Sequence, residues 1–309
     1  MITTLEKCQL CGGSRLIGLD LKDKNDAHLA EVPGSDRIGW SLCSQCSFIF
    51  QNPRQSQEEQ EDLYGESGYR KSGLTPIPEG YIRYSPHQLA RFIYWLAMCG
   101  IDLREVRNWN CLDFGCGIGG ALHFLGDQGN NVYGVELDRA LGDFGNANYK
   151  VKIKRRVEEL PRDLDFDMIF NHHSLEHVYD PNEFFEFAAK RLKPGGVLIN
   201  VIPTWRYSNT SESLREFNSF HNCMYDHISF AGFMNKHGFF MESHLYHNQA
   251  QDGDWELCAI GRKSAKKNYF SWNVEEVMTE LFTHIPKREA ERAGNFQGSE
   301  NVAVVNGRA

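Results

Sequence analysis

Short apolar runs alternate with helical apolar patterns through the middle of the chain. Each run is short enough for a buried strand, and in most cases a segment with apolar residues every three or four positions follows it. This alternation predicts strands joined by crossover helices, hence an α/β fold with a parallel sheet. The expected strands span residues 109–113, 132–137, 151–154, 166–171 and 197–202.

The pattern changes toward both ends of the chain. Residues 239–246 and 255–261 are two further apolar runs, which we expect to form a hairpin after a short helix. Further helices are expected from Ser56, whose capping box includes Glu59, and over residues 85–99, 184–192 and 274–283. We therefore expect a helical linker or lid over 53–108, and a helix followed by a flexible polar tail over 264–309.

The first of these strands runs into a turn that is rich in glycine. Asp113 is followed by Gly115, Gly117 and Gly119, and a helical pattern resumes directly afterwards. Glycine permits positive φ and lets backbone N–H groups approach a ligand at the N-terminus of a helix. The turn therefore predicts a nucleotide-like ligand, and Gly115, Gly117 and Gly120 also satisfy the pattern of dinucleotide binders.

Glu136 stands at the end of the next expected strand, about twenty residues beyond the glycine turn. An acidic side chain there can accept hydrogen bonds from both ribose hydroxyls of an adenosine ligand. Enzymes that bind different adenosine cofactors share this need, so Glu136 alone does not choose between them.

Residues with acid–base chemistry follow the strand 166–171, where the sequence continues HHSLEHV from residue 172. Loops at the carboxyl ends of parallel strands line the ligand crevice, so these side chains are expected to face the reacting groups. A neutral histidine can act as a general base near neutral pH. His177, with Glu176 beside it, is the first candidate and His173 the second, although neighbours on a helix point about 100° apart.

Four of the nine cysteines form two C-x-x-C pairs, Cys8 with Cys11 and Cys43 with Cys46. Four thiolates complete a tetrahedral zinc site and leave no open position, so the metal would be structural. The expected strands 15–21 and 38–42 are too short for a core of their own, and metal binding would supply about 10–16 kcal/mol. Residues 1–52 are therefore predicted to be a small zinc ribbon, with reduced, unliganded cysteines as the alternative.

Composition narrows the function classes. The chain of 309 residues is 41% hydrophobic and 24% charged, with a net charge of −8, which argues against nucleic acid as a partner. The N-terminus has no apolar run of signal-peptide length, and nowhere do about eighteen apolar residues run together, which predicts a cytoplasmic protein without a membrane span.

The pattern Asp113-x-Gly115-x-Gly117-x-Gly119 resembles the first motif of class I S-adenosylmethionine (SAM) dependent methyltransferases. Phe-Asp at 166–167, Leu-Glu-His-Val at 175–178 and Leu-Lys-Pro-Gly-Gly at 192–196 resemble the later motifs of that family in order and spacing. The resemblance implies a Rossmann-like seven-stranded sheet over residues 109–263 with an antiparallel last strand.

The same resemblance implies the residues that contact the cofactor. Gly115, Gly117 and Gly119, with Asp113, would hold the methionine part of SAM, and Glu136 would hold its ribose. Leu137, His172 and Glu158 complete the implied cofactor set, with Glu158 against the adenine amino group. Arg156 stands where the family frequently has Asp, so the adenine contact departs from the family pattern.

A four-cysteine module before such a domain resembles bacterial methyltransferases that include sugar C-methyltransferases. The segment FQNPR at 50–54 resembles a related group linked with saccharides and secondary metabolites. We therefore expect a SAM-dependent methyltransferase with a structural Zn²⁺ that methylates oxygen or carbon of a small-molecule acceptor. The aromatic segment 203–225 is a candidate substrate cap.

Three other functions are compatible with these motifs. They are a NAD-dependent oxidoreductase, a zinc-ribbon nucleic-acid methyltransferase and a SAM-binding protein without catalysis. The sequence does not choose the acceptor or predict the oligomeric state.

Overall fold

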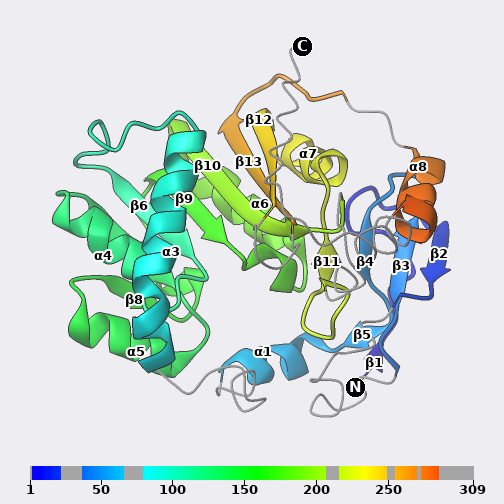
Figure 1. Ribbon diagram of the computed structural model, residues 1–309, viewed down its shortest axis with the longest axis horizontal. Helices are drawn as coiled ribbons and strands as arrows, with labels where there is room; N and C mark the ends of the chain where they lie inside the picture. Colours follow the sequence, from blue (N-terminus) through cyan, green and yellow to red (C-terminus); the bar gives the residue numbers. More distant parts are fainter. Residues whose placement is uncertain are drawn as a thin grey trace, which may run out of the picture.

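A seven-stranded sheet forms the centre of the protein (Figure 1). The structure is a computed structural model, and it describes residues 2–21, 37–65, 79–206, 216–248, 255–269 and 273–284. Its strand order is β12-β13-β10-β9-β6-β7-β8. The strands are β6 Asn110–Phe114, β7 Asn131–Val135, β8 Lys152–Lys154, β9 Phe166–His172, β10 Leu192–Thr204, β12 Phe239–Asn248 and β13 Trp255–Lys263. Neighbours from β10 to β8 pair in parallel, whereas β13 is antiparallel to both β10 and β12. The predicted sheet with its antiparallel last strand is confirmed.

The two faces of the sheet are covered by different helices because side chains alternate along each strand. On β10, Val197, Ile199 and Val201 pack with the helices α3 (Glu79–Met98) and α4 (Gly120–Asp127). Leu198 and Ile202 face the other side and join the core formed with α6 (Pro181–Arg191) and α7 (His227–Lys236). Continuous apolar runs are therefore required in the central strands, as the sequence shows.

Helix starts follow local capping chemistry in several places. Asp138 accepts hydrogen bonds from the backbone at the start of α5 (Arg139–Asn148), and Asp180 does so for α6. Ser56 and Glu59 form the predicted capping box before α1 (Gln57–Gly65). The helix expected over 85–99 begins earlier, at Glu79, and runs through Pro86. The apolar residues at helical spacing begin only at Leu89, so the pattern did not mark its first turns.

The cysteine-bearing N-terminal part shares a sheet with the rest of the chain. Its strands are β1 Ile2–Thr3, β2 Leu16–Leu19, β3 Trp40–Cys43, β4 Ile49–Gln51 and β5 Arg54–Gln55. The strand β11 (Cys223–Met224) pairs with β4, which gives a four-stranded sheet in the order β11-β4-β3-β2. Phe48 and Phe50 belong to the same core as Phe185 and Phe233. Residues 1–52, expected as a separate module, are thus continuous in packing with the central domain.

Polar side chains of the FQNPR segment strengthen this junction. The buried guanidinium of Arg54 donates to the carbonyl oxygen of Tyr179 at 2.7 Å and lies 3.6 Å from the centre of its ring. The side-chain amide of Gln51 donates to the carbonyl oxygens of Asn218 and Ser219. Between the first two cysteines, the amide of Gln9 also donates to Tyr179. These contacts hold the N-terminal part against the loop that follows β9 and against the segment before β11.

The C-terminal helix α8 (Val274–Thr279) continues into a π-helical turn (Glu280–His284) and packs its Val277 and Leu281 on the N-terminal sheet. The aromatic segment 203–225 contributes Trp205 and Phe217 to the same cluster. The expected lid over 66–78, Tyr207 and the tail 285–309 lie outside the described residues. Within the described ranges, no helix has the length and apolar character that crossing a membrane requires.

Candidate functional site

The glycine turn between β6 and α4 has the backbone that its sequence requires. Gly115, Gly117 and Gly119 have φ values of 77°, 54° and 77°, a region that side chains disfavour. A Cβ on Gly115 would lie 2.0 Å from Oγ of Ser174, so this position also needs glycine for space. Ser174, which the sequence reasoning did not single out, therefore packs the loop after β9 directly against the turn.

Asp113 and Glu136 bring two carboxylates to this turn. The backbone N–H groups of Gly117 and Asp138 each donate to Glu136 at 2.8 Å. Asp113 is only 7% exposed, and its carboxyl group makes no hydrogen bond to the residues that the structure describes. Burial, and then the charge of Glu136, raise the pKa of Asp113 from 3.8 to about 7. A cationic ligand here would relieve this repulsion.

The other expected cofactor residues are spread around this centre. Leu137 directly follows Glu136 after β7 and is partly buried, whereas Glu158, in the short helix η2 (Val157–Glu159), is exposed. Arg156, next to η2, forms an ion pair with Glu61 of α1. His172 lies with its Nε2 3.8 Å from the carboxylate of Glu256 on β13. Burial and the neighbouring His173 hold the pKa of His172 well below its ordinary value.

His173 forms a buried ion-pair network with residues that are distant in the sequence. Its Nε2 is 2.5 Å from Oε1 of Glu256, a residue that is 1% exposed, and Arg91 of α3 also contacts that oxygen. Burial opposes the negative charge of Glu256, but His173 outweighs this effect, so the pKa of Glu256 is lowered to about 2. Burial likewise opposes protonation of His173, but Glu256 outweighs it and raises the pKa of His173.

The backbone at His173 supports a functional role for this residue. Its φ of 51° places a residue other than glycine in the left-handed region, which is sparsely populated by such residues. Strain of this kind persists only where the surroundings impose it, and it gathers at functional sites.

His177 and Glu176 lie in the short helix η3 (Leu175–His177) that follows. Nδ1 of His177 is 2.8 Å from the hydroxyl of Tyr64 and 3.1 Å from the carbonyl oxygen of Phe220. Its Nε2 is 3.6 Å from Oε1 of the buried Glu176. The ring of His221 packs edge to face against that of His177 at 4.9 Å. The structure thus groups His177 with Glu176 and His221, next to the network of His173, whose pKa is raised, against the effect of burial, by Glu256 and also by Glu176.

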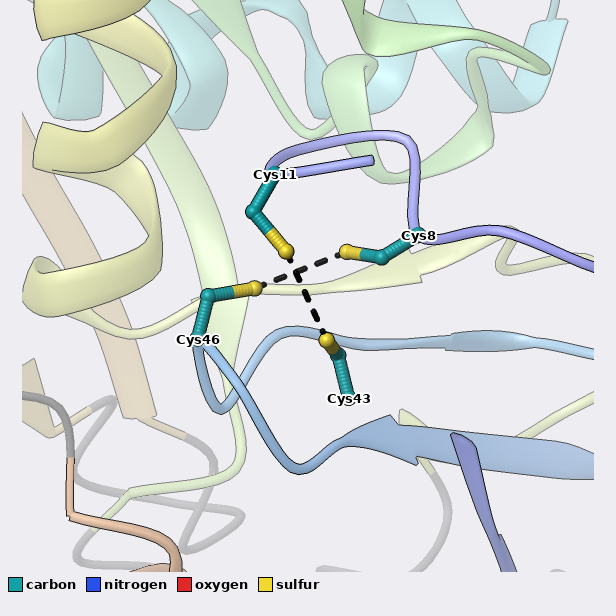
Figure 2. A group of neighbouring side chains, drawn as sticks. All are labelled: Cys8, Cys11, Cys43 and Cys46. Atoms are coloured by element: carbon teal, nitrogen blue, oxygen red, sulfur yellow. Dashed lines mark hydrogen bonds between the residues drawn. The ribbon is translucent and has the colours of Figure 1, made fainter. Parts of the chain in front are cut away.

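The four predicted cysteines meet at one point. Figure 2 shows the thiol of Cys8 facing Cys46 and that of Cys11 facing Cys43, with sulfur separations of 3.5 and 3.6 Å. The neighbouring thiols of Cys46 and Cys8 donate hydrogen bonds that lower the pKa of Cys43. The hydrogen bond with Cys43, followed by burial, raises the pKa of Cys8 to about 12, and a hydrogen bond with Cys43 raises the pKa of Cys46 as well. The cluster without a metal therefore favours one thiolate, at Cys43, and a thiolate is the form that binds metals.

Sequence reasoning missed the partners that complete both histidine groups. Arg91 comes from α3, Glu256 from β13 and His221 from the segment before β11. Neither Glu256 nor Arg91 belongs to a local motif, and only the fold brings them to β9. The aromatic and histidine content of 203–225 was the one available signal for His221.

Curated proteins with related sequences are methyltransferases. The ubiquinone biosynthesis O-methyltransferase of Rickettsia bellii is 34% identical over 101 residues, which cover 31% of this chain and 42% of that protein. The sterol 4-C-methyltransferase strm-1 of Caenorhabditis elegans is 25% identical over 181 residues, which cover 55% of this chain and 50% of that protein. The chain thus spans half or less of the length of these relatives.

Solved structures show the same fold at low sequence identity. The 1,6-didemethyltoxoflavin-N1-methyltransferase of Burkholderia thailandensis, with bound S-adenosylhomocysteine, is 16% identical and has a TM-score of 0.52, and the match covers 70% of this chain and 96% of that one. Magnesium protoporphyrin IX methyltransferase of Synechocystis PCC 6803 is 13% identical, with a TM-score of 0.51 over 68% of this chain and 100% of that one. A family model described as a methyltransferase domain matches residues 81–259, more than half of the chain. The sheet order and this match together show that the chain belongs to the methyltransferase domain family and has the fold of SAM-dependent methyltransferases.

Proposed function

We propose that the protein transfers a methyl group from SAM to a small-molecule acceptor. The pair of carboxylates at the glycine turn carries this proposal. SAM presents an ammonium and a sulfonium group, whereas the pyrophosphate of NAD is negatively charged. The buried Asp113, beside Glu136, attracts the first ligand and repels the second, so the electrostatics favour SAM over the dinucleotide alternative.

The residues at the turn fit SAM in the following roles. The backbone from Gly115 to Gly119 would lie against its methionine part, Asp113 would pair with its ammonium group and Glu136 would accept from its ribose hydroxyls. Leu137 and Glu158 remain proposed contacts of its adenosine part, and His172 is proposed for the same cofactor side of the site. When bound, SAM supplies a methyl group that its sulfonium makes electrophilic.

We propose His173 as the general base, ahead of His177. The ionised carboxylate of Glu256 can only accept a hydrogen bond, so Nε2 of His173 carries the proton and Nδ1 holds a lone pair. That lone pair can take the proton from an acceptor hydroxyl or an acidic carbon. Glu256 orients the ring and stabilises its protonated form, and Arg91 holds Glu256 in turn.

We also propose a structural zinc ion at Cys8, Cys11, Cys43 and Cys46. Zinc–sulfur bonds of about 2.3 Å in a tetrahedron place the sulfurs about 3.8 Å apart. The observed 3.5 and 3.6 Å are close to that spacing. Because Gln9 between the first two cysteines contacts Tyr179, the metal would also stabilise the loop after η3.

The acceptor remains defined by class only. Two of the relatives are named for ubiquinone biosynthesis and for a sterol, which supports a small-molecule acceptor. A sugar, saccharide or secondary metabolite is the acceptor that the resemblance of the N-terminal segment favours, methylated on oxygen or carbon.

Two measurements test this function. Calorimetry should find micromolar or tighter binding of SAM and no binding of NAD⁺ at the same concentrations. Incubation with methyl-labelled SAM and a bacterial metabolite extract should label a low-molecular-weight product, identified by its mass. Binding of NAD⁺ with no binding of SAM would reverse the assignment, and SAM binding without any labelled product would favour a protein that binds SAM without catalysis.

A further inference from the structure

Glu176, His177 and His221 form a cluster of ligand-type side chains that the proposed reaction does not use. One carboxylate oxygen or ring nitrogen from each lies within 4.8 Å of those of the other two. Two of these residues come from η3, and the third comes from the segment that leads into β11. The cluster thus joins the loop after β9 to a segment that is distant in the sequence.

Backbone carbonyl groups hold both imidazole rings in a defined state. Nδ1 of His221 is 2.7 Å from the carbonyl oxygen of Glu216, and Nδ1 of His177 is 3.1 Å from that of Phe220. A carbonyl oxygen can only accept, so each Nδ1 carries the proton and each Nε2 has its lone pair. Histidines that bind metals are commonly oriented by such a hydrogen bond from the second ring nitrogen.

The surroundings of the Glu176 carboxylate also point to a bound cation. Its side chain is 1% exposed, and its Oε2 has no hydrogen-bond partner among the residues that the structure describes. Within the described part of the chain, no lysine or arginine forms an ion pair with it. Glu256, equally buried, has Arg91 as well as His173. In the described residues Glu176 has histidine neighbours but no permanently charged partner. A buried carboxylate in such surroundings is costly, so the position of Glu176 favours a bound cation.

We propose that Glu176, His177 and His221 bind a divalent transition-metal cation. Two imidazoles and one carboxylate are a ligand set that suits manganese, iron or zinc, and three protein ligands leave coordination positions open. If the proposed methyl transfer is correct, the acceptor would fill these positions with two neighbouring oxygen atoms, such as a diol or a hydroxyketone. His177 would then be a metal ligand, which leaves His173 as the base.

Manganese is the probe that separates this site from the cysteine cluster, because Mn²⁺ prefers nitrogen and oxygen ligands to thiolates. The full-length protein, loaded with no more than one zinc ion per chain so that zinc does not also fill the second site, is titrated with MnCl₂, and free Mn²⁺ is counted by electron paramagnetic resonance. We expect about one bound Mn²⁺ per chain. Glu176→Gln and His221→Ala should each weaken binding at least about 100-fold. His244→Ala, which removes a partly buried histidine from β12, is the matched control and should bind like wild type.

Two outcomes would overturn the cation site: no stoichiometric Mn²⁺ binding to wild type, or equal affinity in Glu176→Gln and His221→Ala. Zinc content and SAM affinity are measured on every variant as a check that it is folded. A variant that has lost both its zinc and its SAM affinity is replaced by His221→Gln. The two proposals fail separately. Methyl transfer that needs no Mn²⁺ would contradict only the coordination of the acceptor by the cation, whereas absent SAM binding would contradict the proposed function and leave Mn²⁺ binding unaffected.

Discussion

Replacing Asp113 by Asn should stabilise the protein without ligand and weaken SAM binding. Burial and Glu136 raise the pKa of Asp113 from 3.8 to about 7. A shift of about three units corresponds to about 4 kcal/mol of penalty on the ionised carboxylate. Asn has nearly the same shape and no charge, so it removes that penalty.

The pH dependence of the stability follows from the direction of this shift. Between pH 3.8 and about 7 the folded protein holds the proton of Asp113 while the unfolded chain releases it, so the wild type loses stability as the pH rises. The advantage of Asp113→Asn in the free energy of unfolding should therefore grow from less than about 2 kcal/mol at pH 5 to about 4 kcal/mol at pH 8. Urea unfolding at the two pH values, followed by tryptophan fluorescence, measures it.

SAM affinity should change in the opposite direction. Loss of one charge-assisted hydrogen bond, roughly 1.5–3 kcal/mol, raises the Kd by about one to two powers of ten. Because Asp113 must be ionised to pair with the ammonium group, the wild type should bind SAM about tenfold more tightly at pH 8 than at pH 6. The variant should lack this dependence in calorimetry.

Asp138→Asn is the matched control for this experiment. Asp138 is also 7% exposed and caps α5 close to the turn, and Asn caps helices about as well as Asp. Its replacement should leave stability within about 0.5 kcal/mol of wild type at both pH values. Equal stability of wild type and Asp113→Asn at pH 8, with unchanged SAM affinity, would refute the electrostatic reasoning at the turn.

Four further substitutions test the remaining assignments. Glu136→Ala should weaken SAM binding by about one to two powers of ten in calorimetry, and an unchanged Kd in a folded variant removes Glu136 from the site. Cys43→Ser should abolish a zinc content of about one ion per chain in elemental analysis, and a wild type that contains no zinc contradicts the site. His173→Ala should lower turnover by about 10²–10⁴ with SAM affinity within a few-fold of wild type. Glu256→Gln should move the acid limb of the pH–rate profile to lower pH, because Glu256 raises the pKa of His173; a limb that stays in place argues against this pairing.

Local sequence patterns were sufficient to predict the central sheet and the glycine turn. Except for β8, which is Lys-Ile-Lys, the strands of the sheet are largely apolar runs with their own boundaries. The requirement for glycine at residues 115 and 119 is visible in a few neighbouring residues. The two C-x-x-C pairs were equally local, so the convergence of the four cysteines followed from their spacing. In contrast, β11 is a strand of two residues with no periodicity to detect.

The choice between His173 and His177 depended on contacts that the sequence does not encode locally. Adjacency to Glu176 favoured His177, yet the carboxylate that bonds directly to a histidine ring nitrogen here is Glu256 on β13. Arg91 is equally remote, since it comes from α3 before the sheet begins. Only the strand order, which places β13 beside β10 and β10 beside β9, brings these residues within reach of His173.

The pairing of β4 with β11 has a consequence for any attempt to shorten the protein. Strand β11 belongs to the second half of the chain, but its hydrogen-bonding partner is supplied by residues 49–50. A truncated chain that starts at residue 53 would leave the main-chain groups of β11 without that partner and uncover Phe185 and Phe233, which pack with Phe48. Unprotected strand edges and bare aromatic surface promote self-association, so we expect such a fragment to aggregate. The smallest soluble methyltransferase unit of this protein therefore includes its cysteine-bearing N-terminus.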